Sequence, residues 1–316
     1  MNERYDQMYQ AASRYYVQGE TMESIARQLG LSRSSVSRLL KQARTSGLVR
    51  ISLADQQGSP APLAAALDRA FGVRVHLVAV RESASENRRF DQVARLAGRL
   101  LSEAVGDRQV IGVAWGVTAS HVVRYLQPRP LVGATVVQMN GGSNPWSSGI
   151  PYVGEILQSV GDAFGARVVY FPVPAFFDYP ETKRAMWRER SVQNVVQLQQ
   201  RMDVAVFGVG CLNAQVPSHV YTAGYMDDAE KQRLAADGVV GDVATVLLRE
   251  DGSWTDIDLN SRASGLSPAE LANVPRRFCV VADPSRAAAV VGALRAGTTT
   301  DLVIDESTGR AVLERL

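Results

Sequence analysis

The stretch TMESIARQLGLSRSSVSRLLKQAR, residues Thr21–Arg44, predicts two short helices joined by a tight turn. Thr21 is a suitable cap for the first helix, and Gly30 ends it because glycine readily adopts the left-handed conformation of a helix C-terminus. Ser32 is placed to cap the second helix. Apolar residues recur at helical spacing in both halves, so the two helices can pack on each other. These residues are Met22, Ile25, Ala26 and Leu29 in the first helix and Val36, Leu39 and Leu40 in the second.

The other face of the second helix carries hydroxyl groups and cations, and no acidic residue. In a major groove, cations meet phosphates and guanine edges while serines approach the backbone or bases closely. The face therefore predicts a DNA-reading surface made of Ser32, Arg33, Ser34, Ser35, Ser37, Arg38 and Lys41. The alternative is an ordinary surface hairpin with a solvated polar face. The charge distribution favours DNA: residues 1–50 hold 8 Lys and Arg against 4 Asp and Glu, whereas the other 266 residues hold 26 against 28.

The composition describes a globular protein with two unequal domains: 316 residues, 46% apolar and 21% charged. No apolar run approaches the roughly 20 residues that cross a bilayer, and the polar N-terminus lacks the apolar stretch of a signal peptide. We therefore expect a cytoplasmic protein that does not associate with membranes. Cys211 and Cys279 lie in or beside strand-like apolar runs, which predicts buried thiols. The three histidines lie far apart without ligand spacing, so we expect neither a metal site nor a cofactor.

The chain divides into a small all-α helix-turn-helix domain over residues 1–54, a linker over residues 55–62 and an α/β domain over residues 63–316. We expect a first helix at Tyr5–Gln18 and a short strand beginning at Leu48-Val49. The linker is polar and contains prolines, which is typical of a connection between domains.

Beyond the linker, strand-like and helical stretches alternate. Several strand runs are apolar throughout, as expected for a mostly parallel, Rossmann-like sheet with helices on both faces. The predicted strands are Val73–Val80, Val110–Ala114, Ala134–Met139, Arg167–Phe171, Val204–Gly208, Val243–Leu248, Phe278–Ala282 and Leu302–Ile304. The predicted helices include Arg88–Ala104, Thr118–Leu126, Pro151–Phe164, Glu181–Gln200, Asp228–Ala236 and Pro284–Arg295. Asp251-Gly252, between two β-rich segments, predicts a hairpin.

Three glycine-containing loops follow predicted strands, where ligands of open α/β sheets bind. In Gly112–Ser120, the backbone at Gly116 and the hydroxyl of Thr118 could hold a phosphate, or the loop could be a tight turn without a ligand. The loops Gln138–Gly149 and Phe207–Leu212 are each weak signals alone. Their shared position at strand ends predicts one pocket.

Three further side chains are candidates for this pocket. Asp242, an acid among apolar residues, is either a hydroxyl acceptor or a satisfied turn residue. Arg286, in the first turn of a predicted helix, could meet an anion or be a solvated surface residue. Trp115 could stack on a ligand or pack in the core.

The chain resembles the SorC/DeoR-type bacterial transcriptional regulators, which include sorbitol operon, deoxyribonucleoside and central glycolytic gene regulators. The resemblance covers nearly the whole chain, and its motifs occur in family order. They are the helix-turn-helix Ile25–Leu40, GVAWGVT (112–118), QMNGG (138–142), AVFGVG (205–210), GVVGDV (238–243), NVPRRFCVVADPSRAAAVVGALRAG (273–297) and DLVIDESTGRAVL (301–313).

This resemblance implies a cytoplasmic regulator that binds operator DNA as a dimer or tetramer, with a large effector-binding domain similar to sugar-phosphate isomerases and deaminases. The effector in that family is usually a phosphorylated sugar. By position, Gly116, Thr118 and Arg286 would face its phosphate. Asn140, Gly141, Gly142 and Asp242 would face the sugar.

Two departures from the family pattern bear on the effector. The family commonly has glycines before the late helix and a lysine in its first turn, whereas this chain has Asp283-Pro284-Ser285-Arg286. Val117 stands where a polar or cationic residue is common. These changes leave a sugar phosphate, an unphosphorylated sugar and a polyol all open as effectors.

The residues and the resemblance together indicate a transcriptional regulator controlled by a sugar, polyol or sugar phosphate. The alternative is a sugar-phosphate isomerase or deaminase with an added DNA-binding domain. Asp242 would be its base, but no histidine falls on a ligand loop and no second acid accompanies it. We therefore expect no catalytic residues.

Overall fold

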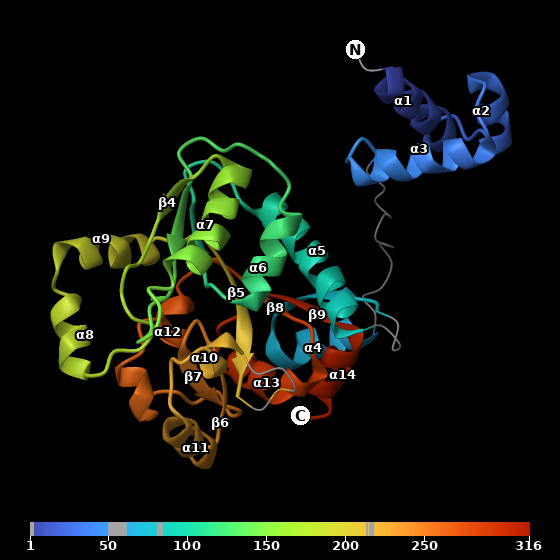
Figure 1. Cartoon of the computed structure of the whole chain (residues 1–316). Coiled ribbons are helices and arrows are strands. Elements are labelled where there is room, and N and C mark those ends of the chain that lie inside the picture. The colour runs from blue at the N-terminus through green and yellow to red at the C-terminus, as the bar shows by residue number, and fades with distance from the viewer. Residues whose placement is uncertain (1–2, 50–61, 81–84, 213, 215–217) are drawn as a thin grey trace. The chain divides into compact units, whose positions relative to one another are not determined.

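The computed structural model describes residues 3–49, 62–80, 85–212, 214 and 218–316. The chain divides into two compact units, Met1–Ser59 and Pro60–Leu316 (Figure 1). The predicted linker lies outside the described residues except for Pro62, which begins a helix. The predicted limits of the two domains therefore stay predictions.

The first unit contains the predicted helices in the predicted order: α1 (Glu3–Tyr16), α2 (Met22–Leu29) and α3 (Arg33–Thr45). The Thr21 hydroxyl accepts from the Ser24 N–H and the Ser32 hydroxyl from the Ser35 N–H, so both caps form. Gly30 closes α2 with a φ of 65°. The core of this unit is Met8, Ala11, Ala12, Ile25, Ala26, Val36, Leu39, Leu40 and Ala43, and Met22 and Leu29 pack partly buried against it.

The short strand predicted at Leu48-Val49 is wrong for these two residues. The Val49 N–H donates to the Ala43 carbonyl, 2.9 Å away, and both side chains pack against the core of the first unit. Closing the end of α3 in this way satisfies a helix carbonyl that a strand would leave exposed.

The second unit is built on one sheet, whose seven parallel strands lie in the order β1-β9-β8-β5-β2-β3-β4. β6 and β7 extend it as an antiparallel hairpin on the end of β5. The strands are β1 (Arg74–Val78), β2 (Val110–Val113), β3 (Thr135–Gln138), β4 (Arg167–Val169), β5 (Val204–Cys211), β6 (Val239–Val243), β7 (Val246–Arg249), β8 (Arg276–Val281) and β9 (Asp301–Asp305). A helical unit followed by a mostly parallel α/β unit is the fold class predicted from the sequence.

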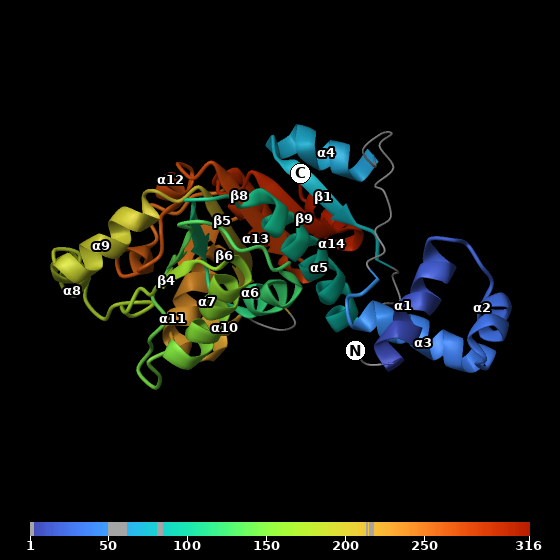
Figure 2. The same ribbon diagram turned by 90° about the horizontal axis from the view of Figure 1, so that it is seen from above.

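Helices cover both faces of this sheet (Figure 2). The α-helices are α4 (Pro62–Phe71), α5 (Glu86–Ala104), α6 (Val117–Val122), α7 (Ile150–Phe164), α8 (Pro180–Met186), α9 (Arg190–Gln199), α10 (His219–Thr222), α11 (Asp228–Ala236), α12 (Pro268–Leu271), α13 (Ala287–Arg295) and α14 (Glu306–Leu313). Short 3-10 segments are Val123–Tyr125, Asp258–Ser261 and Pro284–Arg286. None of the helices within the described ranges is long and apolar enough to span a membrane.

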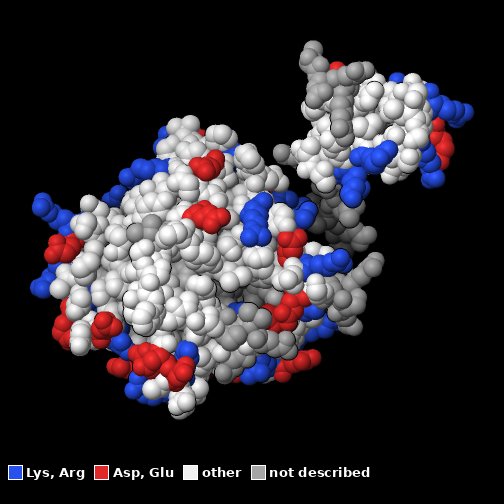
Figure 3. All heavy atoms as spheres, in the orientation of Figure 1, with Lys and Arg blue, Asp and Glu red and all other residues white. Residues whose placement is uncertain are grey.

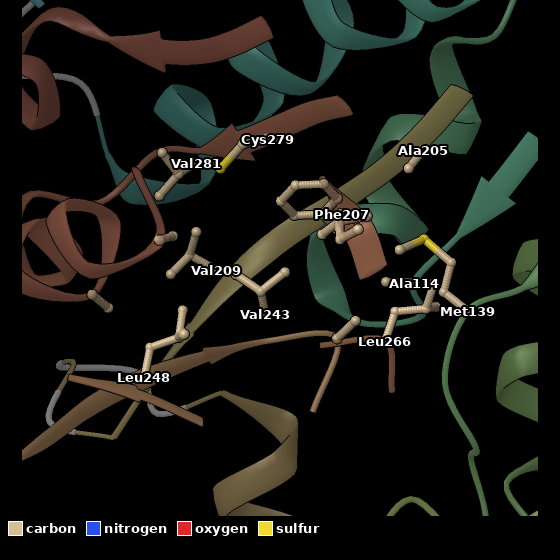
Figure 4. Close-up of a cluster of buried hydrophobic side chains, with 14 of the residues drawn as sticks. Ala114, Met139, Ala205, Phe207, Val209, Val243, Leu248, Leu266, Cys279 and Val281 are labelled. Atoms are coloured by element: carbon tan, nitrogen blue, oxygen red, sulfur yellow. The ribbon is translucent and has the colours of Figure 1, made fainter. Parts of the chain in front are cut away.

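Alternating residues of the strands supply the two cores. Ala205, Phe207 and Val209 of β5 point to one face, beside Cys279 and Val281 of β8 (Figure 4), and α4, α9, α13 and α14 cover it. The intervening residues point to the other face, which α5, α6 and α7 cover. Cys211 and Cys279 are both buried, as predicted.

The hairpin turn predicted at Asp251-Gly252 is wrong. The turn lies at Ala244-Thr245, between β6 and β7, with φ angles of 47° and 71°. Neither residue type favours positive φ, which is why the sequence pattern missed this turn. The Asp242 carboxylate holds it by accepting from the Thr245 N–H, 3.0 Å away. Asp251-Gly252 does turn the chain, but the residues directly after it form no strand.

The single helix predicted over Glu181–Gln200 is two helices, α8 and α9. Trp187 ends α8 and packs edge-on against Phe171 and Phe177, which directs the chain into a turn before α9 begins. Likewise, the helix predicted from Pro284 starts as a 3-10 segment and becomes α-helical only at Ala287.

Candidate functional site

A cavity of about 210 Å³ lies at the carboxyl ends of three adjacent strands, β8, β5 and β2. After β2 the chain continues to β3 and β4 on one side of β2, and then returns to β5 on the other side. The cavity therefore opens at the point where the strand order reverses, which is where open α/β sheets bind their ligands. Its volume is below the roughly 300–1,000 Å³ of pockets for drug-sized ligands and suits a compound of monosaccharide size.

The structure brings five of the predicted effector residues together in this cavity. Trp115, Gly116 and Thr118 follow β2, Asp242 comes from the hairpin on β5, and Arg286 follows β8. Gly208 of β5 lies directly under Thr118, since a Cβ on this glycine would stand 2.4 Å from the threonine Oγ1. The turn after β2 and the last residues of β5 thus form one wall. The loop predicted over Phe207–Leu212 is wrong for most of its length, because β5 continues to Cys211.

Asp242 is a turn residue, one of the two roles that the sequence left open, and it also lines the cavity. Its Oδ2 accepts from the Thr245 N–H, which holds the hairpin turn. Its Oδ1 is buried and has no hydrogen-bond partner among the described residues, although the side chain lines the cavity. Burial raises the pKa of this carboxyl. The neighbouring Tyr221 hydroxyl, the Thr245 N–H and the positive charge of Arg286 lower it, but by less. Asp242 is therefore a turn residue with one oxygen left to accept a hydrogen bond.

Arg286 is held in place by several acceptors and is not a solvated surface residue. Its Nη1 donates to the Val209 carbonyl at 3.0 Å and to the Ser218 hydroxyl at 2.7 Å. Its Nε lies 3.3 Å from the carboxylate of Asp283. The guanidinium thus joins the end of β5 to the turn that begins the late helix.

Trp115 is 7% exposed and separates the cavity from the loop after β3. Its Nε1 donates to the Gly141 carbonyl at 2.9 Å, and its ring stacks on Tyr225. The indole therefore packs in the core, one of its two predicted environments, and also lines the cavity, while stacking on a ligand stays a prediction.

The structure does not bring Asn140, Gly141 and Gly142 to this cavity. Asn140 is 1% exposed, and the Gly141 N–H donates to the Ser264 hydroxyl. A Cβ on Gly141 would meet the carbonyl oxygens of Val173 and Pro174 at 2.3 and 2.2 Å, so this turn is packed against another loop. A direct contact of these three residues with an effector stays a prediction.

Sequence reasoning missed two histidines in the cavity wall, His121 of α6 and His219 of α10. They come from elements that begin after the β2 and β5 loops, so no motif spacing pointed to them. Burial lowers the pKa of His121, with Arg124 adding to the effect. The N-terminal part of α5 adds Glu86, Asn87 and Phe90, which precede all three glycine-containing loops in the sequence.

The described residues contain no group of three or more His, Cys, Asp or Glu side chains that could hold a metal ion. The cavity offers hydroxyls, three carboxylates, aromatic rings and a guanidinium. Such a lining can bind a small polyhydroxy compound, since hydroxyl groups both donate and accept hydrogen bonds.

The first unit presents the predicted DNA-reading surface on α3. Arg33, Arg38 and Lys41 are exposed there, with Ser32, Ser34 and Ser37 beside them and Ser35 half-buried. Figure 3 shows Lys and Arg side chains over α3, with acidic side chains at the end where α2 meets it. Glu23 of α2 pairs with Arg33 at 2.8 Å, an acidic neighbour that the pattern of α3 alone did not reveal.

Residues 55–314 match a family described as "Putative sugar-binding domain", and residues 10–61 match a helix-turn-helix domain. The chain belongs to this sugar-binding domain family. Its relatives include the deoxyribonucleoside regulator of Bacillus subtilis strain 168, which is 27% identical over 97% of both chains. The transcriptional regulator LsrR of Enterobacter sp. strain 638 is 28% identical over 95% of this chain and 90% of that protein. These relatives are transcriptional regulators, as the predicted resemblance implied.

Solved structures agree with this membership. A domain of a "possible sugar-binding transcriptional regulator" from Arthrobacter aurescens TC1 is 44% identical, covers 82% of this chain and 100% of its own, and has a TM-score of 0.76. The full-length sorbitol operon regulator SorC from Klebsiella pneumoniae has the same fold over 99% of this chain and 100% of its own, with a TM-score of 0.81 at 21% identity.

Proposed function

We propose that this protein is an operator-binding transcriptional regulator whose DNA binding is set by a small sugar-like effector in the cavity. The observation that carries the proposal is the cavity at the reversal of strand order, with Asp242, Trp115 and Arg286 in its wall. The effector would bind there, and α3 of the helix-turn-helix would read the DNA.

Relatives of nearly equal length support both halves of the proposal, since they are transcriptional regulators of the same family. Operator DNA and an effector are therefore the proposed partners, and the cytoplasm is the proposed location because the operator lies there. We also propose a homo-oligomer, dimer or tetramer, because a symmetric pair of α3 helices would read two half-sites.

The enzyme alternative is not favoured by these relatives, and we propose that the cavity binds without catalysing a reaction. Incubating the protein with sugar phosphates, and following isomerisation or ammonia release, tests this. No turnover is expected, whereas turnover that disappears in Asp242→Asn would support the enzyme.

DNA binding is tested by selecting fragments of a randomised DNA library on the full-length protein. We expect enrichment of a site with two related halves, and competitor DNA of random sequence should bind much more weakly. Equal binding of all sequences would contradict an operator-binding function.

A further inference from the structure

We infer that the cavity binds an unphosphorylated sugar or polyol, with the Asp242 Oδ1 accepting a hydrogen bond from one of its hydroxyls. The inference rests on the proposed function and deepens it, since it names the chemical class of the effector.

The charges in the cavity wall disfavour a phosphate. Three acidic side chains line it, Glu86, Asp242 and Asp283, and Arg286 is the one Lys or Arg among the described lining residues. A phosphate monoester carries close to two negative charges at neutral pH. Placing it here would add to an existing excess of negative charge in a partly buried space, where Coulomb repulsion is screened less than in water.

Asp283 already occupies the position that an anion would take beside Arg286. Its Oδ1 accepts from the Ser285 N–H at 2.9 Å and from the Ser285 hydroxyl at 2.6 Å, while its Oδ2 lies 3.3 Å from the Arg286 Nε. These are the donors that would otherwise hold a phosphate at the start of a helix. The chain supplies its own carboxylate to them.

The turn after β2 is an equally poor phosphate site. α6 has only six residues, so its dipole is weak, and Gly116 at its start is followed by Val117. The Val117 side chain is 51% exposed and lines the cavity with an isopropyl group. The turn after β2 and α6 contribute no Lys or Arg to the wall among the described residues.

A hydroxyl donor fits the remaining unsatisfied atom. The residue Asp242 is 5% exposed, and its Oδ1 has no hydrogen-bond partner among the described residues. A buried acceptor in this state is costly, and a ligand hydroxyl that donates to it removes the cost without adding charge. Trp115, Phe90 and Val117 provide apolar surface for the carbon skeleton of the ligand.

The test measures thermal unfolding and calorimetric titration of the full-length protein with matched pairs of compounds. The panel contains aldoses, ketoses and alditols, each with its own monophosphate ester, and inorganic phosphate as a separate arm. We expect at least one unphosphorylated compound to raise the melting temperature and to bind about tenfold or more tightly than its ester.

Two variants test which side chains cause the preference for the unphosphorylated compound. Asp242→Asn keeps an oxygen for the Thr245 N–H but removes the carboxylate, and we expect it to lose the response to the unphosphorylated ligand. Asp283→Asn keeps the cap of Ser285 and removes one negative charge, so the preference against the ester should narrow by about threefold to tenfold. Melting of each variant without ligand reports whether it folds. If Asp242→Asn does not fold, the preference of Asp283→Asn between a compound and its ester tests the inference.

The outcomes separate this inference from the proposed function. Tighter binding of the ester than of its parent compound, or an unchanged preference in Asp283→Asn, would overturn the inference and leave a sugar-controlled regulator intact. If no compound of the panel changes the melting temperature, the proposed effector function fails and the inference fails with it.

Discussion

Asp242 shows how one side chain links local backbone structure to the site. The turn at Ala244-Thr245 needs two residues at positive φ, and the carboxylate stabilises it through the Thr245 N–H. The same carboxylate has to lie against β5, where a Cβ on Gly210 would stand 1.8 Å from its Oδ1. Glycine at 210 is therefore required by the site and not by its own backbone conformation.

Gly210→Ala should displace the Asp242 carboxylate and remove the melting response to the ligand, at a cost in stability of about 1–3 kcal/mol. Gly154→Ala in α7 is the matched control, because a Cβ there meets nothing within 4 Å. The control should keep the ligand response and gain up to about 1 kcal/mol, since alanine favours a helix interior over glycine. Unfolding of both variants in urea, with and without ligand, checks this. A normal ligand response in Gly210→Ala would contradict the role of Asp242.

At the scale of elements, α3 carries the claim that the first unit reads DNA. Arg38 is the sharper probe of this helix, because Arg33 is paired with Glu23, whereas the one hydrogen bond of the Arg38 guanidinium to a described side chain is to the Ser35 hydroxyl, at 3.3 Å. The helix is rigidly placed, since Val36, Leu39, Leu40 and Ala43 are buried beneath it.

Arg38→Ala should weaken binding to the selected operator. If the lost contact is to a base edge, the loss is about 1–3 kcal/mol and falls on one position of the site; if it is to a phosphate, the salt dependence of binding decreases by about one unit of slope. Arg184→Ala removes the same charge from an exposed position of α8 and should leave binding unchanged. Binding isotherms at several salt concentrations make the comparison. Equal affinities of Arg38→Ala and the unmodified protein would rule out α3 as the reading helix at this position.

Much of this element structure could be predicted from the sequence because it depends on local chemistry. The caps Thr21, Gly30 and Ser32 mark helix ends by their own hydrogen bonds or φ angles, and apolar runs mark buried parallel strands. The same logic correctly placed the ends of β2 and β5 and five of the eight effector candidates at one cavity, whereas the loop after β3 lies outside it.

The rest depended on contacts between segments far apart in the chain. Trp187 breaks a helical pattern because Phe171 and Phe177 lie beside it, and the loop at Gly141 turns away because another loop packs on it. His121 and His219 reach the cavity only once α6 and α10 are placed. The spacing of residues along the sequence does not reveal such contacts.

At the scale of the large unit, a buried ionic cluster joins three strands at the end of the sheet away from the cavity. Asp301 is 2% exposed and accepts from Arg74, His76 and Arg276 on β1 and β8. Burial alone would raise the pKa of Asp301, but the hydrogen bonds from His76, Arg276 and Thr300 outweigh it and hold the pKa well below its ordinary value.

A depressed carboxyl pKa stabilises the folded state at every pH above the ordinary aspartate value of 3.8, and that stabilisation is lost as the pH falls below it. Asp301→Asn should therefore lower the free energy of unfolding by about 3 kcal/mol at neutral pH, with a difference that shrinks below pH 4. All four tryptophans lie in the second unit, so their fluorescence in urea reports its unfolding between pH 7 and pH 3. Asp68→Asn, at an exposed position of α4, should change little. A pH-independent difference would contradict an ionised cluster.

Control of DNA binding by the cavity is the central claim, and it concerns the whole molecule. The most direct measurement is the affinity of the full-length protein for its selected operator, with and without the compound that raises its melting temperature. The account predicts a change of about 5- to 150-fold in either direction, which Asp242→Asn abolishes while its ligand-free affinity for DNA persists. An operator affinity that stays the same when the cavity is saturated would contradict the account.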